Sequence, residues 1–367
     1  MIRVGIIGAG SIGNHLAFSA RKKGWDVTVT DNSSDSMERF REVIYPQRYG
    51  EFDQGIELLS LEDFWAKKYE IIFIGTPPDS HFDLFLKALA LKPKIIVIEK
   101  PISHPNLEVL REFDKHIKNS NIPVLCGYNH RVGLNTKLAL ELARTNSIGL
   151  PKLLTSKVLE SWDGILKAHP WLNGPQESYL GYTQRGGGAT FEHSHGIDLW
   201  MYYAHKLHVG EITKISAKGK FVVTDDGLDY DEMIHIDIET TSGCQGIVAQ
   251  DVITDPSQKY VEIHGENGYI KSIVGDTKVS DRVLWKSTAD HKISADVLIN
   301  KTRYFDFDNE IDEIERLYKL GATKNISSAL DAEMAIKSAF VGCAALEAAR
   351  LGVTLTLDFT SLSWEKV

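Results

Sequence analysis

A glycine turn near the start of the chain constrains the fold most. Gly8, Gly10 and Gly13 form a Gly-x-Gly-x-x-Gly pattern directly after the strand-like run IRVGIIG, and residues 11–23 then follow a helical pattern. Strand, glycine turn and helix in this order are the context that a dinucleotide-binding fingerprint requires. Free N–H groups at the start of the helix would favour the pyrophosphate. The alternative is that the glycines serve packing only. The expected pyrophosphate contacts are Gly8, Gly10, Ser11, Ile12 and Gly13.

An acidic residue follows where a ribose contact is expected. Asp31 ends the second strand-like run, DVTVTD, about 20 residues after the glycines. Its carboxylate could accept hydrogen bonds from the adenosine ribose hydroxyls. No arginine follows directly, since the next residues are Asn32, Ser33 and Ser34. A 2′-phosphate would therefore meet a negative charge without a nearby cation, which favours NAD over NADP.

Short apolar runs alternate with helical patterns through the first third of the chain. EIIFIGTP and KIIVIEKP are continuously apolar and stop at turn residues, as is typical of parallel strands buried on both faces. The segment between them, DSHFDLFLKALALK, is amphipathic at helical spacing. Residues 1–125 are therefore predicted to form an α/β Rossmann domain, with a doubly wound parallel sheet.

The pattern changes in the remaining residues, 126–367. Residues 134–144 are predicted to be helical, and from residue 211 to residue 273 alternating runs punctuated by turns indicate a mainly antiparallel sheet. A long helix rich in small residues is predicted at about 327–351, ended by Gly352. Whether it packs back on the first domain is left open. Residues 126–367 are thus predicted to form a second α/β domain with a large open sheet.

Polar residues follow the buried strands of the first domain. The carboxyl ends of such strands face the ligand crevice in open α/β sheets, so the motifs GTPPDSH, EKP and GYNHR are candidates for contacts there. A lysine at the end of a buried strand is costly unless it points into a cleft or is solvated. His81 has the alternative of capping the next helix. The expected cofactor contacts in the first two motifs are Thr76, Pro77, His81, Glu99 and Lys100.

In residues 186–199, GGGATFEHSHGIDL, a glycine run is followed by one acid and two histidines, Glu192, His193 and His195. Three interpretations are open: a metal site, a proton-transfer site, or incidental packing. In a continuous helix Glu192 and His195 would share a face at i and i+3. His193 would lie about 100° away from Glu192, so the two histidines would not converge. No third ligand of fitting spacing follows, which disfavours a metal and favours proton transfer.

Together, GAGSIG, EKP, GYNHR and a glycine run leading to an acid and a histidine resemble the Gfo/Idh/MocA family of glucose–fructose oxidoreductases and inositol dehydrogenases. The order and spacing of the motifs match from residue 1 to about 350. The resemblance implies a Rossmann domain, a second domain whose open sheet forms a dimer or tetramer contact, and a nicotinamide dinucleotide cofactor. It also implies that the substrate is a sugar, cyclitol or nucleotide sugar.

The resemblance further implies roles for three residues. Lys100 would lie beside the nicotinamide and the reacting oxygen, Asn129 near the nicotinamide, and His195 would transfer the proton. One departure is Glu192, because the family usually has an aspartate before the histidine. Glu192 could hold the imidazole or contact a sugar hydroxyl.

These observations predict an NAD-dependent oxidoreductase that acts on a hydroxyl carbon of a sugar-like substrate, including sugar acids. Lys100, Glu192 and His195 are the expected catalytic residues. Two alternatives stay open: a redox-neutral enzyme that retains NAD, and a non-enzymatic regulator. The expected substrate contacts, each with packing as its alternative, are Arg131, Trp162, Trp171, Tyr179, Arg185 and His195.

Charge and cysteine usage limit the partners and the compartment. The formal net charge of −9 argues against nucleic acid and anionic membranes as partners. Cys126, Cys244 and Cys343 are far apart and odd in number, so neither a disulfide framework nor a zinc site is expected. The N-terminus enters a strand pattern without the features of a signal peptide. The cytoplasm is the expected compartment.

Overall fold

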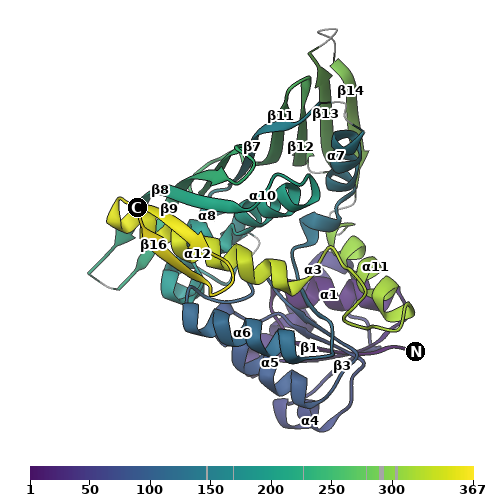
Figure 1. Cartoon of the computed structure of the whole chain (residues 1–367). Coiled ribbons are helices and arrows are strands. Elements are labelled where there is room, and N and C mark those ends of the chain that lie inside the picture. Colours follow the sequence, from purple (N-terminus) through teal and green to yellow (C-terminus); the bar gives the residue numbers. More distant parts are fainter. Residues whose placement is uncertain (146–147, 168, 226, 278, 289–292, 302–304) are drawn as a thin grey trace. The chain divides into compact units, whose positions relative to one another are not determined.

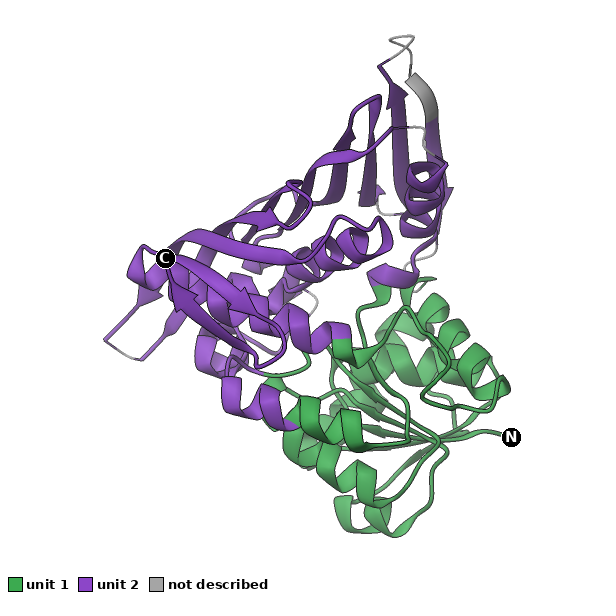
Figure 2. Cartoon of the chain, viewed as in Figure 1, with its two compact units in different colours: residues 1–103, 113–129, 304–333 green, residues 104–112, 130–303, 334–367 purple. Residues whose placement is uncertain are grey.

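The computed structural model describes residues 1–145, 148–167, 169–225, 227–277, 279–288, 293–301 and 305–367 (Figure 1). The chain divides into two compact units, coloured separately in Figure 2. The first comprises residues 1–103, 113–129 and 304–333, and the second residues 104–112, 130–303 and 334–367. The units therefore interleave along the chain, whereas the predicted domains meet once, between residues 125 and 126.

The first unit contains a parallel sheet of six strands in the order β3-β2-β1-β4-β5-β6. All the described pairings in this sheet are parallel. Every residue of the two apolar runs that form β4 and β5 is buried, as their composition predicts. The order reverses at β1 and β4, which confirms the predicted doubly wound sheet. The strands are β1 (Arg3–Ile7), β2 (Asp26–Thr30), β3 (Ile56–Leu58), β4 (Ile71–Ile74), β5 (Ile95–Ile98) and β6 (Val124–Cys126).

Helices connect these strands. α1 directly follows the glycine turn, as predicted, and α6 contributes residues to both units. The α-helices are α1 (Ser11–Lys22), α2 (Ser34–Arg39), α3 (Tyr45–Tyr49), α4 (Leu61–Ala66), α5 (His81–Ala90) and α6 (Leu107–Asn119). Shorter helical segments are the π-helix η1 (Phe40–Ile44) and the 3₁₀ turn η2 (Pro78–Ser80).

A helix from late in the chain, α11 (Phe305–Lys319), completes the first unit. It packs beside α1: the ring of Phe307 stacks on His15 with centroids 4.6 Å apart, and Asp308 accepts a hydrogen bond from Ser19 at 2.9 Å. Near its other end, Tyr318 donates a hydrogen bond to Glu70, just before β4. α11 therefore runs in the same direction as α1, and its first turns lie near the carboxyl ends of the strands.

The second unit is built on a ten-stranded sheet in the order β14-β13-β12-β11-β7-β10-β9-β8-β15-β16. The described pairings are antiparallel except that between β7 and β10. The predicted mainly antiparallel open sheet is confirmed. The strands are β7 (Pro151–Leu159), β8 (Ile212–Val223), β9 (Asp229–Thr240), β10 (Gln245–Asp251), β11 (Gln258–Gly265), β12 (Gly268–Thr277), β13 (Ser280–Ser287), β14 (Ile293–Asn300), β15 (Thr354–Asp358) and β16 (Ser363–Lys366).

The helices of the second unit pack on this sheet, and α10 runs along one of its faces (Figure 1). The indole of Trp200 on α10 is buried and donates to the carbonyl of Leu154 on β7 at 2.8 Å. The α-helices are α7 (Leu134–Arg144), α8 (Trp162–Lys167), α9 (Gly188–Glu192), α10 (His195–Lys206) and α12 (Ala332–Leu351). The 3₁₀ turns are η3 (Asn129–Val132), η4 (Pro175–Glu177), η5 (Tyr179–Gly181) and η6 (Thr183–Arg185).

Two helix predictions need correction. The helix expected from about residue 327 begins at Ala332, because Leu330 accepts a backbone hydrogen bond from Cys126 at 2.8 Å and Asp331 forms a bridge with Leu125 beside β6. The continuous helix expected through Glu192 and His195 is interrupted at residues 193–194, where α9 ends and α10 begins. Tertiary contacts described below stabilise that interruption.

No helix in the described ranges is both long enough and apolar enough to cross a bilayer. The three cysteines are free thiols and are buried. Burial raises the pKa of Cys244 to about 11 and that of Cys343 to about 12, so both thiols are protonated at neutral pH.

Candidate active site

The glycine turn of the first unit leaves open space at Gly10. Gly8 has a φ of +114°, and a Cβ there would lie 2.5 Å from the carbonyl oxygen of Gly75. A Cβ on Gly13 would lie 2.0 Å from the carbonyl oxygen of Gly8. A Cβ on Gly10 would meet no described atom within 4 Å, and Gly10 is the N-cap of α1 without a side-chain hydrogen bond to the helix. The first-turn N–H groups, from Ser11 and Ile12 onward, are therefore placed to bind an anion.

A guanidinium that the sequence did not single out lies at the same helix start. Arg48, on α3, donates from Nη1 to the carbonyl oxygen of Ser11 at 2.8 Å and from Nη2 to its hydroxyl at 2.7 Å. Nη1 also lies 3.2 Å from Nε2 of His15. A cation at this position complements a pyrophosphate. Arg48 is 37 residues from Ser11 along the chain, so the glycine motif does not predict it.

Asp31 lies in a pocket of about 670 Å³ next to the glycine turn. Its Oδ2 accepts from the N–H of Ala9 at 2.8 Å, and its Oδ1 accepts from the N–H of Ser33 at 3.0 Å. Arg41 lines the same pocket and forms an exposed ion pair with Glu42. The helical segment after β2 thus brings a cation, Arg41, to the pocket that Asp31 lines, although no arginine follows Asp31 directly in the sequence.

His81 braces the loop after β4. Its ring is fully buried, with Nε2 at 2.8 Å from the carbonyl oxygen of Thr76 and Nδ1 at 3.3 Å from that of Ile102. Burial lowers the pKa of His81 and keeps the ring neutral. The hydroxyls of Thr76 and Ser80 lie 2.7 Å apart, and Ser80 donates to the carbonyl of Pro77. His81 thus has no exposed surface for the predicted cofactor contact, whereas Thr76 and Pro77 form the loop that it supports.

Buried polar groups gather at the carboxyl ends of β5 and β6. Glu99 is buried, its Oε2 accepts from the N–H of Lys100 at 3.3 Å, and a Cβ on Gly127 would lie 2.6 Å from its Oε1. Glu310 of α11 is fully buried, and burial together with the nearby Glu99 raises the pKa of Glu310 well above its ordinary value. Asn129 is buried, and its Oδ1 has no hydrogen-bond partner among the described residues. This unsatisfied acceptor suits a ligand amide, as the predicted nicotinamide contact requires.

In the second unit, the glycine run closes onto the protein itself. Gly186 and Gly188 have φ values of +95° and +79°. A Cβ on Gly187 would lie 2.2 Å from the carbonyl oxygen of Tyr179, and one on Gly188 would lie 2.1 Å from Oδ1 of Asp231. The glycines are therefore required for the chain to pass this close.

Asp231, a fully buried residue of β9, holds the start of α9. Its Oδ2 accepts from the N–H and the hydroxyl of Thr190 at 2.7 and 2.6 Å. Burial raises the pKa of Asp231 to about 7, although both hydrogen bonds oppose the shift. The sequence did not single out Asp231, because its partner lies 41 residues away.

Gln250 of β10 stabilises the interruption between α9 and α10. It is fully buried, donates from Nε2 to the carbonyls of Ala189 and Thr190 at 2.7 and 3.0 Å, and accepts at Oε1 from the N–H of Ile197 at 3.0 Å. Both sides of the interruption are thereby fixed to one strand. His195 is the first residue of α10, so this bridge holds its backbone.

The residues around the interruption separate into buried and accessible groups. The hydroxyl of Tyr179 donates to Oε2 of Glu192 at 2.8 Å, so two predicted site residues meet directly. His193 is buried, with Nε2 at 3.0 Å from the carbonyl oxygen of Glu160, and burial lowers its pKa. Glu192 and His195 remain half-buried. His193 therefore has a packing role, and Glu192 and His195 are the residues available for chemistry.

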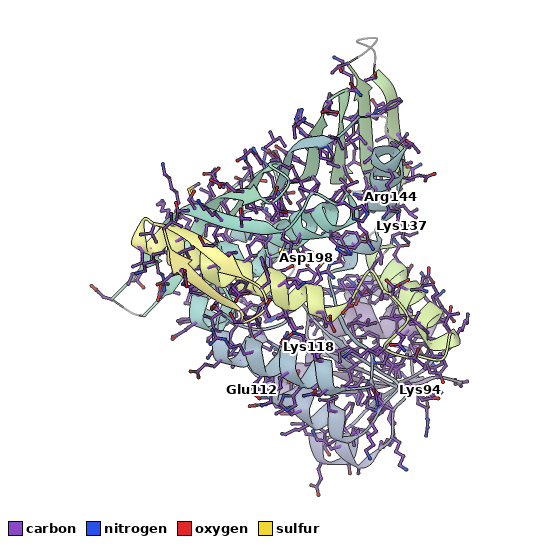
Figure 3. The ribbon with its side chains drawn as sticks, in the orientation of Figure 1. Lys94, Glu112, Lys118, Lys137, Arg144 and Asp198 are labelled. Atoms are coloured by element: carbon purple, nitrogen blue, oxygen red, sulfur yellow. The ribbon has the colours of Figure 1, made fainter. Side chains whose placement is uncertain are left out.

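Arg131 is not positioned as the predicted substrate contact. Its guanidinium is buried with the carboxylate of Asp198, which accepts from Nε at 2.7 Å and pairs with Nη2. Asp198 lies on α10 and is labelled in Figure 3. Ser338 of α12 also donates to Asp198, at 3.0 Å. The side chains of Arg131 and Asp198 are both fully buried, so Arg131 presents no surface to a substrate, and the pair links η3, α10 and α12 instead.

The remaining predicted pocket residues lie on the segments before the glycine run. Trp162, on α8, packs against the core cluster of Ala189, Tyr230 and Val252, which supports its packing alternative. Trp171 lies edge-on to His169, with ring centroids 5.2 Å apart. Arg185 is half-buried at the end of η6, immediately before the glycine run. Tyr179, another predicted pocket residue, contacts Glu192 through its hydroxyl.

The described residues contain no group of three or more histidine, cysteine, aspartate or glutamate side chains that could hold a metal ion. By contrast, the first unit has several features that fit a dinucleotide. These are the open position at Gly10, the guanidinium at Ser11, the pocket at Asp31 and the unsatisfied oxygen of Asn129.

Solved structures with the same fold cover nearly the whole chain. A putative myo-inositol dehydrogenase from Sinorhizobium meliloti 1021 is 20% identical, with a TM-score of 0.73 over 97% of this chain and 99% of that chain. A myo-inositol dehydrogenase from Corynebacterium glutamicum is 19% identical, with a TM-score of 0.72 over 98% and 99%. A levoglucosan dehydrogenase in complex with NADH and levoglucosan is 18% identical, with a TM-score of 0.75 over 100% and 99%. At these identities the likeness establishes the fold.

The family match is confined to the N-terminal third of the chain. No curated protein sequence matches the chain. Residues 2–128 match the Gfo/Idh/MocA family model, described as an oxidoreductase family with an NAD-binding Rossmann fold. This match contains the glycine turn, Asp31 and the EKP motif, and it ends within the GYNHR motif. The predicted resemblance is therefore confirmed over residues 2–128, which are similar to the NAD-binding Rossmann fold of the Gfo/Idh/MocA oxidoreductase family.

Proposed function

We propose that this chain is an NAD-dependent dehydrogenase that oxidises or reduces a hydroxyl carbon of a sugar, cyclitol, sugar acid or nucleotide sugar. The observation that carries the proposal is the braced segment around His195. Buried Asp231 and Gln250 fix its backbone, while the side chains of Glu192 and His195 stay accessible. A rigid support for accessible acid–base groups is what proton transfer requires.

Each group has a separate role in this proposal. Bound NAD supplies the hydride acceptor. His195 takes the proton of the substrate hydroxyl at an imidazole nitrogen, and the Lys100 ammonium stabilises the charge that develops on the oxygen. Glu192, held by the hydroxyl of Tyr179, orients the substrate or the imidazole. Asn129 contacts the carboxamide of the cofactor.

The substrate class is supported by what the similar structures are named for. They include inositol dehydrogenases and a levoglucosan dehydrogenase in complex with its sugar. Tyr179, Trp171 and Arg185 are polar or aromatic groups of the kind that bind sugar rings and acidic substituents. We therefore place the substrate beside the segment of residues 171–195.

We also propose that copies of the chain form a dimer or tetramer through the ten-stranded sheet, and that the enzyme acts in the cytoplasm. The face of this sheet carries half-buried side chains such as Lys157, Tyr260 and Lys271, with the ammonium of Lys271 3.7 Å from the ring centroid of Tyr260. The three buried free thiols suit a reducing compartment.

A panel of sugars, cyclitols, sugar acids and nucleotide sugars tests the proposal, with NADH formation followed by absorbance. At least one class should give turnover with NAD⁺. On that substrate, His195→Asn should lower kcat by about 10²–10⁴-fold, the usual worth of a general base, and leave NADH affinity nearly unchanged. Lys100→Met should have a comparable effect. A His195→Asn enzyme of near-normal kcat would contradict the assigned role.

The same preparation separates the proposal from its alternatives. A redox-neutral enzyme would carry tightly retained NAD and convert a sugar without net NADH formation. A regulator would bind NAD and a ligand with no turnover of either. Wild-type and His195→Asn proteins should therefore also be analysed for bound cofactor after purification.

A further inference from the structure

A second imidazole lies against His195. The ring centroids of His130 and His195 are 4.3 Å apart, with an angle of 42° between the ring planes. Both residues belong to the second unit, His130 on η3 and His195 at the start of α10. The two rings are therefore in direct contact.

The surrounding structure fixes this pairing. The neighbour of His130, Arg131, forms the buried ion pair with Asp198, one turn after His195 on α10. The carbonyl of His130 accepts from the hydroxyl of Thr136 at 2.8 Å. On the His195 side, Gln250 accepts a hydrogen bond from the backbone N–H of Ile197, two residues after His195. Each ring thus projects from a backbone that buried polar contacts hold on both sides.

Two imidazoles in contact cannot titrate independently. A proton on one ring disfavours a proton on the other, because like charges at this separation repel strongly in a partly buried site. Groups that interact this way lose their protons in two separated steps, which belong to the pair. The pair therefore resists double protonation, which leaves one ring neutral over a wider pH range than a lone histidine would be.

Most of the other ionisable groups on the elements that pack against α10 have partners of their own, while Lys337 lies on α12, which contacts α10 through Ser338. Glu192 on α9 accepts from Tyr179, and Lys259 on β11 pairs with Glu160. The carboxylate of Asp251 on β10 accepts from Thr254. Other engaged groups are Lys157 over the ring of Tyr260, Glu262 with His264 and Lys271, and the Arg131–Asp198 pair.

We propose that His130 is a positioning residue of the proton-transfer site, which keeps the imidazole of His195 neutral and able to accept the substrate proton. The role of His130 in catalysis rests on the proposed function. The coupled titration of the two rings is independent of that function. A phenylalanine at position 130 would keep the ring contact and remove the charge. The exposed His205, near the other end of α10, supplies a matched control.

Histidine NMR titration of the full chain tests the coupling. The wild type should show two steps for the pair, separated by about one pH unit or more. In His130→Phe the lower step should vanish and His195 should titrate near the upper one. His195→Asn should do the same to His130, because coupling is reciprocal. His205→Gln should change neither ring. If His130→Phe folds poorly, the titration of His130 in His195→Asn still tests the coupling.

Coupling would be refuted if the remaining ring titrated in both single variants within about 0.2 unit of its wild-type value, far below the separation expected of coupled sites. Activity gives a separate readout. On the identified substrate, the acid limb of the kcat/KM profile should move to higher pH in His130→Phe, with kcat on the plateau nearly unchanged. Normal turnover in His195→Asn would defeat the proposed function and leave the NMR result standing. Loss of turnover there, with uncoupled titrations, would defeat the role of His130 alone.

Discussion

Two glycine segments, one in each unit, look alike in the sequence and differ in the structure. Both precede a helix start, at Gly10 and at Gly187. A side chain on Gly10 would enter open space, whereas side chains on Gly187 and Gly188 would collide with the protein's own carbonyls and with Asp231. The N-terminus of α1 is thus left for an external anion, and that of α9 is already bound by a buried carboxylate. The presence of glycine alone therefore does not identify a ligand site. Open space beside the glycine indicates a ligand site, and the protein's own atoms beside it indicate a structural turn.

Replacing one glycine by valine in each segment should give the largest effects, on cofactor binding in the first segment and on stability in the second. Gly10→Val should weaken NAD⁺ binding by about 100-fold or more, since the side chain would fill the pyrophosphate's place, and leave the Tm nearly unchanged. Gly188→Val should lower the free energy of unfolding by more than about 3 kcal/mol, because the residue has a positive φ and no room. NADH fluorescence titration and urea unfolding measure the two quantities. Retained NAD⁺ affinity in Gly10→Val would make the first turn structural as well.

The carboxylate that closes the second segment should make stability depend on pH. The pKa of Asp231 is raised from 3.8 to about 7 by burial, so the folded state holds its proton more tightly than the unfolded state. The protonated side chain contributes its full stabilisation to the folded state below about pH 4. As the pH rises to about 7, the free energy of unfolding declines, by about 4 kcal/mol at most. Asp231→Asn should remove this decline.

Urea unfolding of both proteins at several pH values between 4 and 8 measures the effect. Because an asparagine oxygen can still accept from Thr190, the two proteins should be closest in stability at the acid end. Parallel curves for the two proteins across this range would show that Asp231 does not titrate as described.

Cofactor choice sharpens the comparison at the open segment, with a smaller effect. Asp31 should favour NAD(H) over NADP(H), and Asp31→Ala should narrow the difference in affinity by about tenfold, the worth of a charged hydrogen bond. Arg41 lines the same pocket, so Arg41→Met in the Asp31→Ala background should weaken NADP(H) selectively. Equal affinity of the wild type for both cofactors would contradict the role of Asp31.

The sequence predicted best where local pattern and burial coincide. The apolar runs at β4 and β5 are typical of strands buried on both faces, and the glycine turn at Gly8 to Gly13 stands between a strand and a helix, as its fingerprint predicts. The alternation in residues 211–273 likewise became an antiparallel sheet.

Prediction failed where the deciding partner lies far along the chain. Arg131 was expected at the substrate, but its partner Asp198 is 67 residues away. The helix interruption at residues 193–194 depends on Gln250, 53 residues from Ile197. Arg48 reaches Ser11 across 37 residues. Helical periodicity carries no information on such contacts, so one sequence could not reveal them.

Hydrogen exchange measured with and without NAD⁺ tests most directly whether one glycine segment is open and the other closed. Added NAD⁺ should slow exchange in peptides that contain residues 8–14 by about tenfold or more, since bound phosphate would occupy the free N–H groups of α1. Peptides that contain residues 186–192 should be protected already, because Asp231 holds the N–H of Thr190, and should not change. Unchanged exchange at residues 8–14, or new protection confined to residues 186–192, would contradict the account.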